Sequence, residues 1–188
     1  MNGTPAKVVT GAYPLTGDFL AGRLRQNLST DDLKYIEGLI ESVEEHDDGS
    51  CLLGRGVKTD RSMILVEGYI FRTIETANKR FITGINLPGD FVDLHGFALK
   101  RLDHNIEAAG RVRVGCVSHE TLRDVMRERP GVARAMWFAT LLDAAIHRKW
   151  IQTLEQLDAT RRIAHLYAEL HTRLELIGRN VTRAIRTP

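Results

Sequence analysis

The stretch Leu87-Pro-Gly-Asp-Phe-Val-Asp-Leu94 divides a β-rich region of the sequence in two. Before it, Met63–Ile74 and Arg80–Leu87 are rich in β-branched and aromatic residues, and Glu75–Lys79 between them suits a hairpin loop. After it, Arg111–Val117 alternates charged and apolar residues with the period of a half-buried strand. Short strands that are separated by glycine-containing turns predict a sandwich or a barrel over this part of the chain.

Helical periodicity flanks the β-rich region on both sides. Ser29–Val43 begins like a capping box and then places apolar residues at helical spacing, which predicts an amphipathic helix. Ser118–Met126 is predicted as a short helix capped by its serine. Pro130–Leu157 is predicted as a much longer helix, because proline suits the first turn. Asp158–Gly178 is predicted as the last helix, which the aspartate caps and the glycine ends.

The long helix carries two apolar rows. The first row is Val132, Ala135, Ala139, Leu142, Ile146 and Thr153, and the second is Met136, Trp150, Leu154 and Leu157. A helix with two apolar rows cannot bury both on one small barrel. We therefore expect one row to pack on the β part and the first row to pair with a second copy of the chain, in a homodimer. The alternative is a single helix that lies in a groove of its own domain.

The composition indicates a globular protein without a strongly charged surface. The 188 residues include 26 Lys and Arg against 24 Asp and Glu, which gives a formal net charge of +2. With 43% apolar residues, the chain is long enough for one domain, or for one domain with an appendage. A net charge so close to zero does not indicate a nucleic-acid-binding surface. It also gives no support for docking to a membrane through a polybasic patch.

Cysteine content and hydropathy exclude further classes of protein. Cys51 and Cys116 are too few for a disulfide framework or a four-cysteine metal cluster within one chain. Residues 1–17 lack the apolar core of a signal peptide, and the most apolar stretches are shorter than the roughly 20 residues of a membrane span. We therefore expect a cytoplasmic protein without a membrane partner. No nucleophile–base pair or carboxylate pair stands out, so we do not expect an enzyme.

The order of these elements resembles the effector domain and dimerisation helix of the Crp/Fnr family of bacterial transcription regulators. The resemblance extends from about residue 20 to Gly178 and is carried by Gly68–Arg72, Leu87–Leu94, Asp103-x-x-Ile106-x-Ala108, Pro130 and Leu157–Leu166. It implies a mainly β fold with α-helices. In that fold a jelly roll of the cyclic-nucleotide-binding type is followed by a long dimerisation helix and one further helix.

The resemblance also implies a division of the chain. Residues 1–22 would be a flexible N-terminal arm, 23–129 the effector domain, 130–157 the dimerisation helix, and 158–188 the first helix of a truncated DNA-binding domain, with Asp158 as the hinge. Ten residues follow Gly178, too few for the winged helix–turn–helix of such regulators. DNA binding is therefore expected only from a fuller chain. A natural truncation, a frame-shifted gene and a fragment of a longer protein all remain open.

The resemblance places an effector pocket around the residues that follow the Pro-Gly-Asp turn. In the members that bind cyclic AMP, a Glu takes the ribose hydroxyl, and an Arg followed by Ser or Thr holds the phosphate. Here Leu94 stands in place of that Glu and Leu102-Asp103 in place of the second pair, with Arg101 one residue away. We therefore expect no cyclic nucleotide and an effector that the sequence does not identify. The candidate effector-binding residues are Gly89, Asp93, Leu94, His95, Leu102, Asp103 and His147.

Two other sensing chemistries stay open beside this one. His95 stands where the haem-containing carbon-monoxide sensors of the family carry a haem-ligating histidine, whereas Asp93 stands where they place a thiolate. The plain alternative is a histidine that is hydrogen-bonded and holds no ligand, and we expect neither a metal nor a cofactor. Cys51 suits a redox-sensing thiol if it is exposed. The iron–sulfur oxygen sensors are excluded, because residues 1–30 contain no cysteine.

The resemblance implies that the chain is the effector-sensing and dimerising part of a transcription regulator. The mechanism that it implies is that an effector in the pocket changes the pairing of the long helices and the angle of the segment after Asp158. The rival hypothesis is an interaction module that binds no small molecule. Such a module would form a heterodimer with a full-length regulator and so block its DNA binding.

Overall fold

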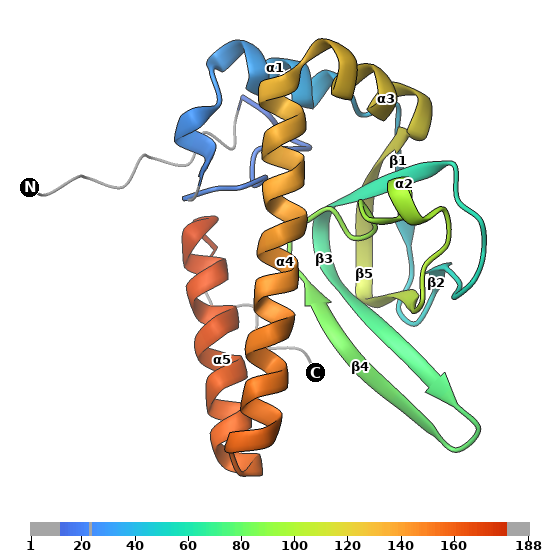
Figure 1. The fold of residues 1–188 in the computed structure, drawn as a ribbon, viewed down its shortest axis with the longest axis vertical. Helices are drawn as coiled ribbons and strands as arrows, with labels where there is room; N and C mark the ends of the chain where they lie inside the picture. Colours follow the sequence, from blue (N-terminus) through green and yellow to red (C-terminus); the bar gives the residue numbers. More distant parts are fainter. Residues whose placement is uncertain (1–11, 23, 180–188) are drawn as a thin grey trace, which may run out of the picture.

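The computed structural model describes residues 12–22 and 24–179, to which every structural statement refers. The β part is a five-stranded antiparallel sheet in which neighbouring strands follow the order β1–β5–β3–β4, with β2 also paired to β5. The strands are β1 (Ser42–His46), β2 (Cys51–Leu53), β3 (Arg61–Thr76), β4 (Lys79–Asn86) and β5 (Asn105–Ser118). In Figure 1 this sheet lies beside the two longest helices.

Strands β3, β4 and β5 confirm the three β-rich stretches predicted from the sequence. β3 and β4 form the predicted hairpin, and its turn consists of only Ala77 and Asn78. β3 and β5 pair along most of their length, from Arg61 opposite Ser118 to Thr73 opposite Asn105. β1 and β2 are short strands that the sequence did not reveal.

Two glycines allow β3 and β5 to bend together into a roll. Gly68 on β3 has φ of 86° and Gly110 on β5 has φ of 81°, a region of backbone conformation that glycine adopts without strain. The pairing of the two strands shifts register on both sides of Glu67, as in β-bulges, which increase the local bend. The strands are therefore long and strongly curved.

Irregular segments close the other side of the roll. The backbone N–H of Val92 donates to the carbonyl oxygen of Met63, and the N–H of Leu65 donates to that of Asp90, both at 2.9 Å. Residues 56–59 pair in a similar way with residues 100–102, as in the isolated bridge between Lys58 and Arg101. The segment after the Pro-Gly-Asp turn is thus fixed to β3 by main-chain bonds.

Helices flank the roll at both ends of the chain. They are η1 (Leu24–Asn27), α1 (Thr30–Gly38), α2 (Gly96–Leu99), α3 (His119–Glu128), α4 (Pro130–Gln156) and α5 (Ala159–Leu176). The side chains of Ser29, Ser118 and Asp158 accept backbone N–H groups at the starts of α1, α3 and α5, which confirms the predicted caps. No helix in the described part of the chain is long and apolar enough to span a membrane.

The first helix is shorter than predicted, and the prediction that it reaches Val43 is wrong. α1 ends at Gly38, and Ser42–His46 forms β1 instead. Val43 lies opposite Gly115 of β5, and the ladder between the two strands satisfies the backbone groups that a longer helix would have paired internally. Tertiary pairing therefore overrides the helical spacing of the apolar residues.

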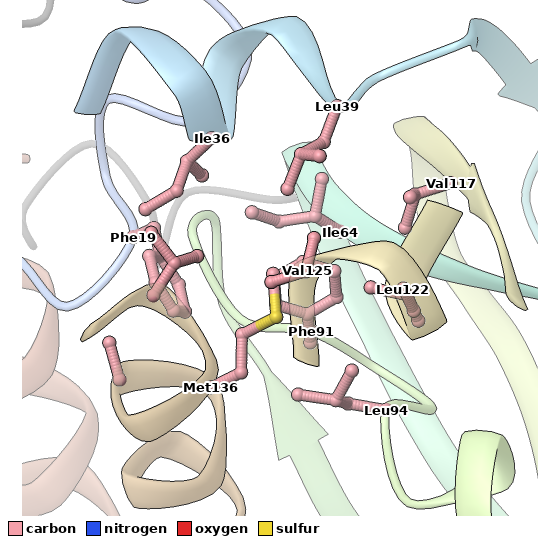
Figure 2. Close-up of a cluster of buried hydrophobic side chains, with 12 residues drawn as sticks. Phe19, Ile36, Leu39, Ile64, Phe91, Leu94, Val117, Leu122, Val125 and Met136 are labelled. Carbon is pink, nitrogen blue, oxygen red and sulfur yellow. The ribbon is translucent and has the colours of Figure 1, made fainter. Parts of the chain in front are cut away.

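One apolar core joins the helices to the end of the roll. Figure 2 shows side chains from α1, β3, α3 and α4 that converge with Phe19 and Phe91, whose rings meet edge to face at a centroid distance of 5.5 Å. Met136 of α4 and Leu122 of α3 are fully buried in this core. Burial of each such side chain contributes about 1.5–3 kcal/mol, so this core fixes the start of α4 on the roll.

Part of the expected flexible arm over 1–22 is packed: of the described residues 12–22, Thr16, Phe19 and Ala21 are buried. Phe19 is only 2% exposed. The backbone N–H groups of Leu15 and Thr16 donate to the carboxylate of Glu37 on α1 at 3.0 and 2.9 Å. Burial of Phe19 outweighs the loop-forming composition of this segment, and residues 1–11 lie outside the described residues.

The last helix folds back along the long one, as Figure 1 shows. α4 ends at Gln156, Leu157 has extended backbone, and Asp158 accepts the N–H of Arg161 at 2.9 Å to begin α5. The C-terminal end of α5 confirms its prediction, because Gly178 has φ of 69° there. α5 therefore returns towards the roll and lies against it.

Replacement of Gly68 by alanine is expected to destabilise the roll more than replacement of Gly110. A Cβ at Gly68 would lie 2.5 Å from the carbonyl oxygen of Arg111, whereas a Cβ at Gly110 would have nothing within 4 Å. We expect Gly110→Ala to lower the free energy of unfolding by about 1 kcal/mol and Gly68→Ala by about 3 kcal/mol. Urea denaturation measures both values, and equal losses would contradict the role of the close approach at Arg111.

Candidate functional site

A cavity of about 90 Å³ lies where the Pro-Gly-Asp turn, α4 and α5 meet. The turn and the segment after it contribute Gly89, Leu94 and His95, and α4 contributes Leu142 and Ile146. Leu176 at the end of α5 forms part of another wall. The cavity therefore combines residues that were predicted for effector binding with residues that were predicted for dimerisation.

Gly89 gives the turn a conformation that only glycine tolerates here. Its φ is 89°, and a Cβ on it would lie 2.4 Å from the carbonyl oxygen of Asp18. The carboxylate of Asp90 accepts the backbone N–H of Leu87 at 2.8 Å and so closes the turn. The turn therefore lies close against the segment before α1. In the structure, Gly89 serves to allow this backbone conformation and this close approach.

A buried ion pair connects the roll to α4. Arg72 comes from β3 and is only 4% exposed, and its Nη1 donates to Oδ2 of Asp143 on α4 at 2.6 Å. Both residues line the cavity. A buried arginine requires such a partner, because an unpaired charge in the interior is costly. The position of α4 against the roll is thus set by charge as well as by apolar packing.

Three histidines surround this ion pair. Burial lowers the pKa of His95 to about 4, and the charge of Arg72 adds to the effect, so His95 is neutral at pH 7. His104 is buried against His95 with a ring-centroid distance of 5.3 Å, and its Nδ1 lies 2.7 Å from Asp103. His147 lies on α4, where its Nδ1 is 2.9 Å from the carbonyl oxygen of Asp143.

Asp93 supports the fold rather than the cavity. It is fully buried, and its Oδ1 accepts the backbone N–H of Met63 at 2.7 Å. Burial raises the pKa of Asp93 to about 7, although Arg72 and Arg61 act in the opposite direction. Its other carboxylate oxygen is buried without a partner among the described residues. Asp93 therefore fixes the segment after the turn to β3.

The structure separates the predicted effector residues into two groups. Gly89, Leu94 and His95 line the cavity, whereas Asp93, Leu102, Asp103 and His147 do not. Leu102 is buried in the core of the roll, and the side chain of Asp103 is 83% exposed to solvent. Neither of these two side chains faces the cavity, and neither supplies a donor for a phosphate group.

Arg173 of α5 holds the last helix on the turn. Its guanidinium donates to the carboxylate of Asp90, to the backbone oxygen of Ile85 at 3.2 Å and to Glu169 at 3.2 Å. Glu169 in turn accepts the indole N–H of Trp150 on α4 at 2.6 Å. The side chain of Arg173 is only 12% exposed. A continuous polar network thus connects α4, α5 and the Pro-Gly-Asp turn.

Apolar contacts reinforce this position of α5. Leu174 and Ile177 are buried in a small cluster with Ala21 and Leu87. A Cβ on Gly22 would lie 2.5 Å from Leu176 Cδ2. α5 therefore packs on the roll through side chains that also close the cavity.

The first apolar row of α4 was expected to pair with a second copy of the chain. Instead, it packs largely within the chain. Val132 and Ala135 are buried in the main core and Thr153 is also buried, while Ala139, Leu142 and Ile146 line the cavity. The face of α4 that points to solvent carries other large residues. Trp137, Leu141 and Ile151 are 65%, 50% and 63% exposed.

The cysteines and the metal chemistry offer no alternative site. Cys51 is exposed, but partial burial of its sulfur and the Glu107 carboxylate raise the pKa of the thiol, which disfavours the reactive thiolate. Cys116 is buried in β5, as expected. In the described residues, no group of three or more His, Cys, Asp or Glu side chains is placed to hold a metal ion.

Sequence reasoning missed the polar residues that build the junction. Arg72 and Asp143 are single charges within otherwise apolar stretches, and that signal marks charges that need a buried partner. Nothing in the sequence shows that Arg72 and Asp143 pair with each other. Arg173 gave no signal, because its role depends on where α5 docks.

Comparison with solved structures finds the same fold in chains of low sequence identity. FixK2 from Bradyrhizobium japonicum is 20% identical with a TM-score of 0.65, and the match covers 70% of this chain but only 66% of FixK2. The c-di-GMP-responsive global regulator CLP from Xanthomonas campestris is 14% identical with a TM-score of 0.59, over 77% of this chain and 83% of CLP. A cyclic nucleotide-binding domain from Methylobacillus flagellatus is 13% identical with a TM-score of 0.59, over 70% and 76% of the two chains.

These likenesses establish the fold. The chain has the jelly roll of the cyclic-nucleotide-binding type, followed by C-terminal helices, as the sequence predicted. The similar structures include regulators of the Crp/Fnr family. No protein-family model and no curated protein matches the sequence.

Asp93 is expected to make the stability of the fold depend on pH. Its pKa in the folded state, about 7, lies above the ordinary value of 3.8, so the folded state keeps a proton that the unfolded state releases. Its contribution to stability is therefore complete below about pH 4 and is lost as the pH rises through about 7.

Asp93→Asn, which keeps an acceptor for the Met63 N–H, should remove this dependence. We expect the stability of the wild type relative to this variant to fall by about 2 kcal/mol between about pH 5 and pH 8. Urea denaturation at several pH values gives the difference. Parallel pH profiles for the two proteins would contradict this prediction.

Proposed function

We propose that this chain is the effector-sensing and dimerising part of a Crp/Fnr-type transcription regulator, and that its effector is not a cyclic nucleotide. The fold and the kind of regulator that shares it support the general role. The observation that carries the proposal is the cavity at the junction, because a single space touches the turn, α4 and α5. A ligand there contacts every element whose movement a regulator would need.

The proposed mechanism is a shift between two arrangements of the helices. A ligand in the cavity would contact Leu142 and Ile146 of α4 and Leu176 of α5. It would favour whichever arrangement offers it better contacts, and this difference in affinity is the only free energy available for the switch. Asp158 caps α5 directly after the joint, so it is the proposed hinge of this movement.

The chemistry of the cavity supports an effector other than a cyclic nucleotide. Leu94 offers no acceptor for a ribose hydroxyl, and Asp103 points to solvent with a negative charge. Arg72 is already paired with Asp143.

A haem or thiol sensor is not supported by the same residues. His95 lines the cavity, but Asp93, which stands where the haem sensors place a thiolate, is a buried carboxylate that accepts the backbone N–H of Met63, so the residues present do not fit that group. Cys51 is exposed, but the raised pKa of its thiol keeps it protonated at neutral pH.

The proposed dimer pairs the outward face of α4 with its copy. Trp137, Leu141, Ala144, Arg148 and Ile151 follow one another at alternating spacings of four and three residues. This is the period of a coiled-coil seam, and large apolar side chains on it are left exposed in the single chain. Residues 158–188 would then begin the DNA-binding domain.

Calorimetry with cyclic AMP and cyclic GMP tests the proposed selectivity of the pocket. We expect no heat of binding at ligand concentrations up to about 1 mM, because Leu94 offers no acceptor for the ribose and neither Leu102 nor Asp103 offers a donor for the phosphate. Binding of either nucleotide in the micromolar range would contradict the argument from Leu94 and Asp103.

Sedimentation velocity tests the proposed dimer. We expect a dimer at micromolar concentration, and we expect Leu141→Glu to raise its dissociation constant at least about a hundredfold, because each charge would be buried at the seam. Gln152→Glu places the same charge on the exposed surface of α4 beside the seam and should leave the dimer intact. A monomeric wild type, or equal effects of the two variants, would contradict the proposed seam.

A further inference from the structure

Three polar atoms of the cavity walls are buried without a partner among residues 12–22 and 24–179. They are Nε of Arg72, Oδ1 of Asn86 and Oδ1 of Asp18, and all three residues line the cavity. Arg72 and Asn86 are more than nine-tenths buried. Buried polar atoms in proteins are nearly always hydrogen-bonded, to protein, to water or to a ligand. Three such atoms around one cavity therefore mark it as a place for polar contacts: one donor and two acceptors.

The charges around the cavity are already compensated. Asp143 is paired with Arg72 at 2.6 Å, Asp90 with Arg173, and Asp18 with Arg179 at 3.0 Å. His95 is neutral at pH 7 because burial lowers its pKa to about 4. An anion would meet the three carboxylates and a cation would meet the guanidinium groups of Arg72 and Arg173, so neither finds a free counter-charge in the cavity wall.

The remaining walls of the cavity are apolar. Leu94, Ala139, Leu142, Ile146 and Leu176 supply them, from the turn segment, from α4 and from α5. One water-sized sphere occupies about 10–15 Å³ on this scale, so about 90 Å³ admits a molecule of only a few non-hydrogen atoms. A ligand with a short apolar body and one polar group therefore fits these walls.

We propose that the junction cavity binds a small uncharged molecule in which an amide-like group, able both to donate and to accept hydrogen bonds, is attached to a branched apolar body. This inference rests on the proposed effector role and adds the chemical class of the ligand. The amide oxygen accepts from Arg72, the amide N–H groups donate to Asn86 and Asp18, and the apolar body lies against Leu142 and Ile146.

Three probes of one shape and different charge test the proposal. They are isobutyramide, isobutyrate and isobutylammonium, titrated into the full chain with ¹³C-labelled isoleucine methyl groups. We expect isobutyramide to shift the methyl signals of Ile146 and Ile177 with a dissociation constant of about 1–10 mM, as for other fragments of this size. The exposed methyl of Ile151 should not respond, which controls for non-specific binding.

Each outcome of the titration decides one point. Tighter binding of isobutyrate or of isobutylammonium would show that a charge is recognised, and it would overturn the proposed ligand class but leave the effector role in place. No shift of Ile146 and Ile177 with any probe would overturn the ligand site. The proposed regulator role fails separately, in the sedimentation experiment, which uses no ligand.

Cavity-filling variants confirm where the probe binds. Leu142→Phe fills the cavity from α4 and should weaken isobutyramide binding at least about tenfold. Leu154→Phe is the matched control, because Leu154 lies on α4, is 57% exposed and does not line the cavity. Thr140→Leu, on another part of the wall, provides the same test if Leu142→Phe does not fold. Unchanged binding in both filled variants would contradict the assigned cavity.

Discussion

The guanidinium of Arg173 connects α5 to the end of β4 and the turn that follows it, which are far from α5 in sequence. It donates to Asp90 in the Pro-Gly-Asp turn, to the main-chain oxygen of Ile85 at the end of β4 and to Glu169 one turn earlier in α5. Glu169 extends the network to Trp150 of α4. A partly buried arginine with several acceptors loses all of them at once if α5 moves, so the docked position of α5 is strongly favoured over small displacements.

This position of α5 determines what the cavity is. Without α5, the wall that Leu176 and Ile177 supply would be absent, and the space beside Leu142 would open to solvent. The pair of Arg72 and Asp143 holds the opposite side, because it fixes α4 to β3. The cavity therefore exists only when both helices are docked, and any molecule that occupies it stabilises that arrangement by mass action.

The sequence predicts the elements of this fold better than it predicts the junction. Strand and helix patterns, the caps at Ser118 and Asp158 and the end at Gly178 depend on local chemistry, and the structure confirms them. The end of α1 was wrong because pairing of Val43 with β5 is a long-range contact. The first apolar row of α4 was expected to be free for a partner but is largely covered by the chain itself, since periodicity shows that a helix has an apolar row but not what covers it.

The candidate site shows the same limit. Three residues of the turn and the segment after it, Gly89, Leu94 and His95, line the cavity, because their neighbours in sequence are also their neighbours in space. Asp93 and Leu102 belong to the same motif but turn into the core of the roll. Whether a side chain faces the cavity or the core depends on the alternation of side-chain direction along a curved segment. A short motif does not reveal that direction.

The central claim is that Arg173 docks α5 on the turn, and amide hydrogen exchange of the full chain tests it most directly. Arg173→Gln removes the contacts to Asp90 and Glu169, and His171→Gln on the exposed side of the same helix is the control. The account predicts that amides of α5 exchange at least about tenfold faster in Arg173→Gln than in the wild type, with the amides of β3 and β5 unchanged. Equal exchange of α5 in the wild type and in Arg173→Gln would contradict it.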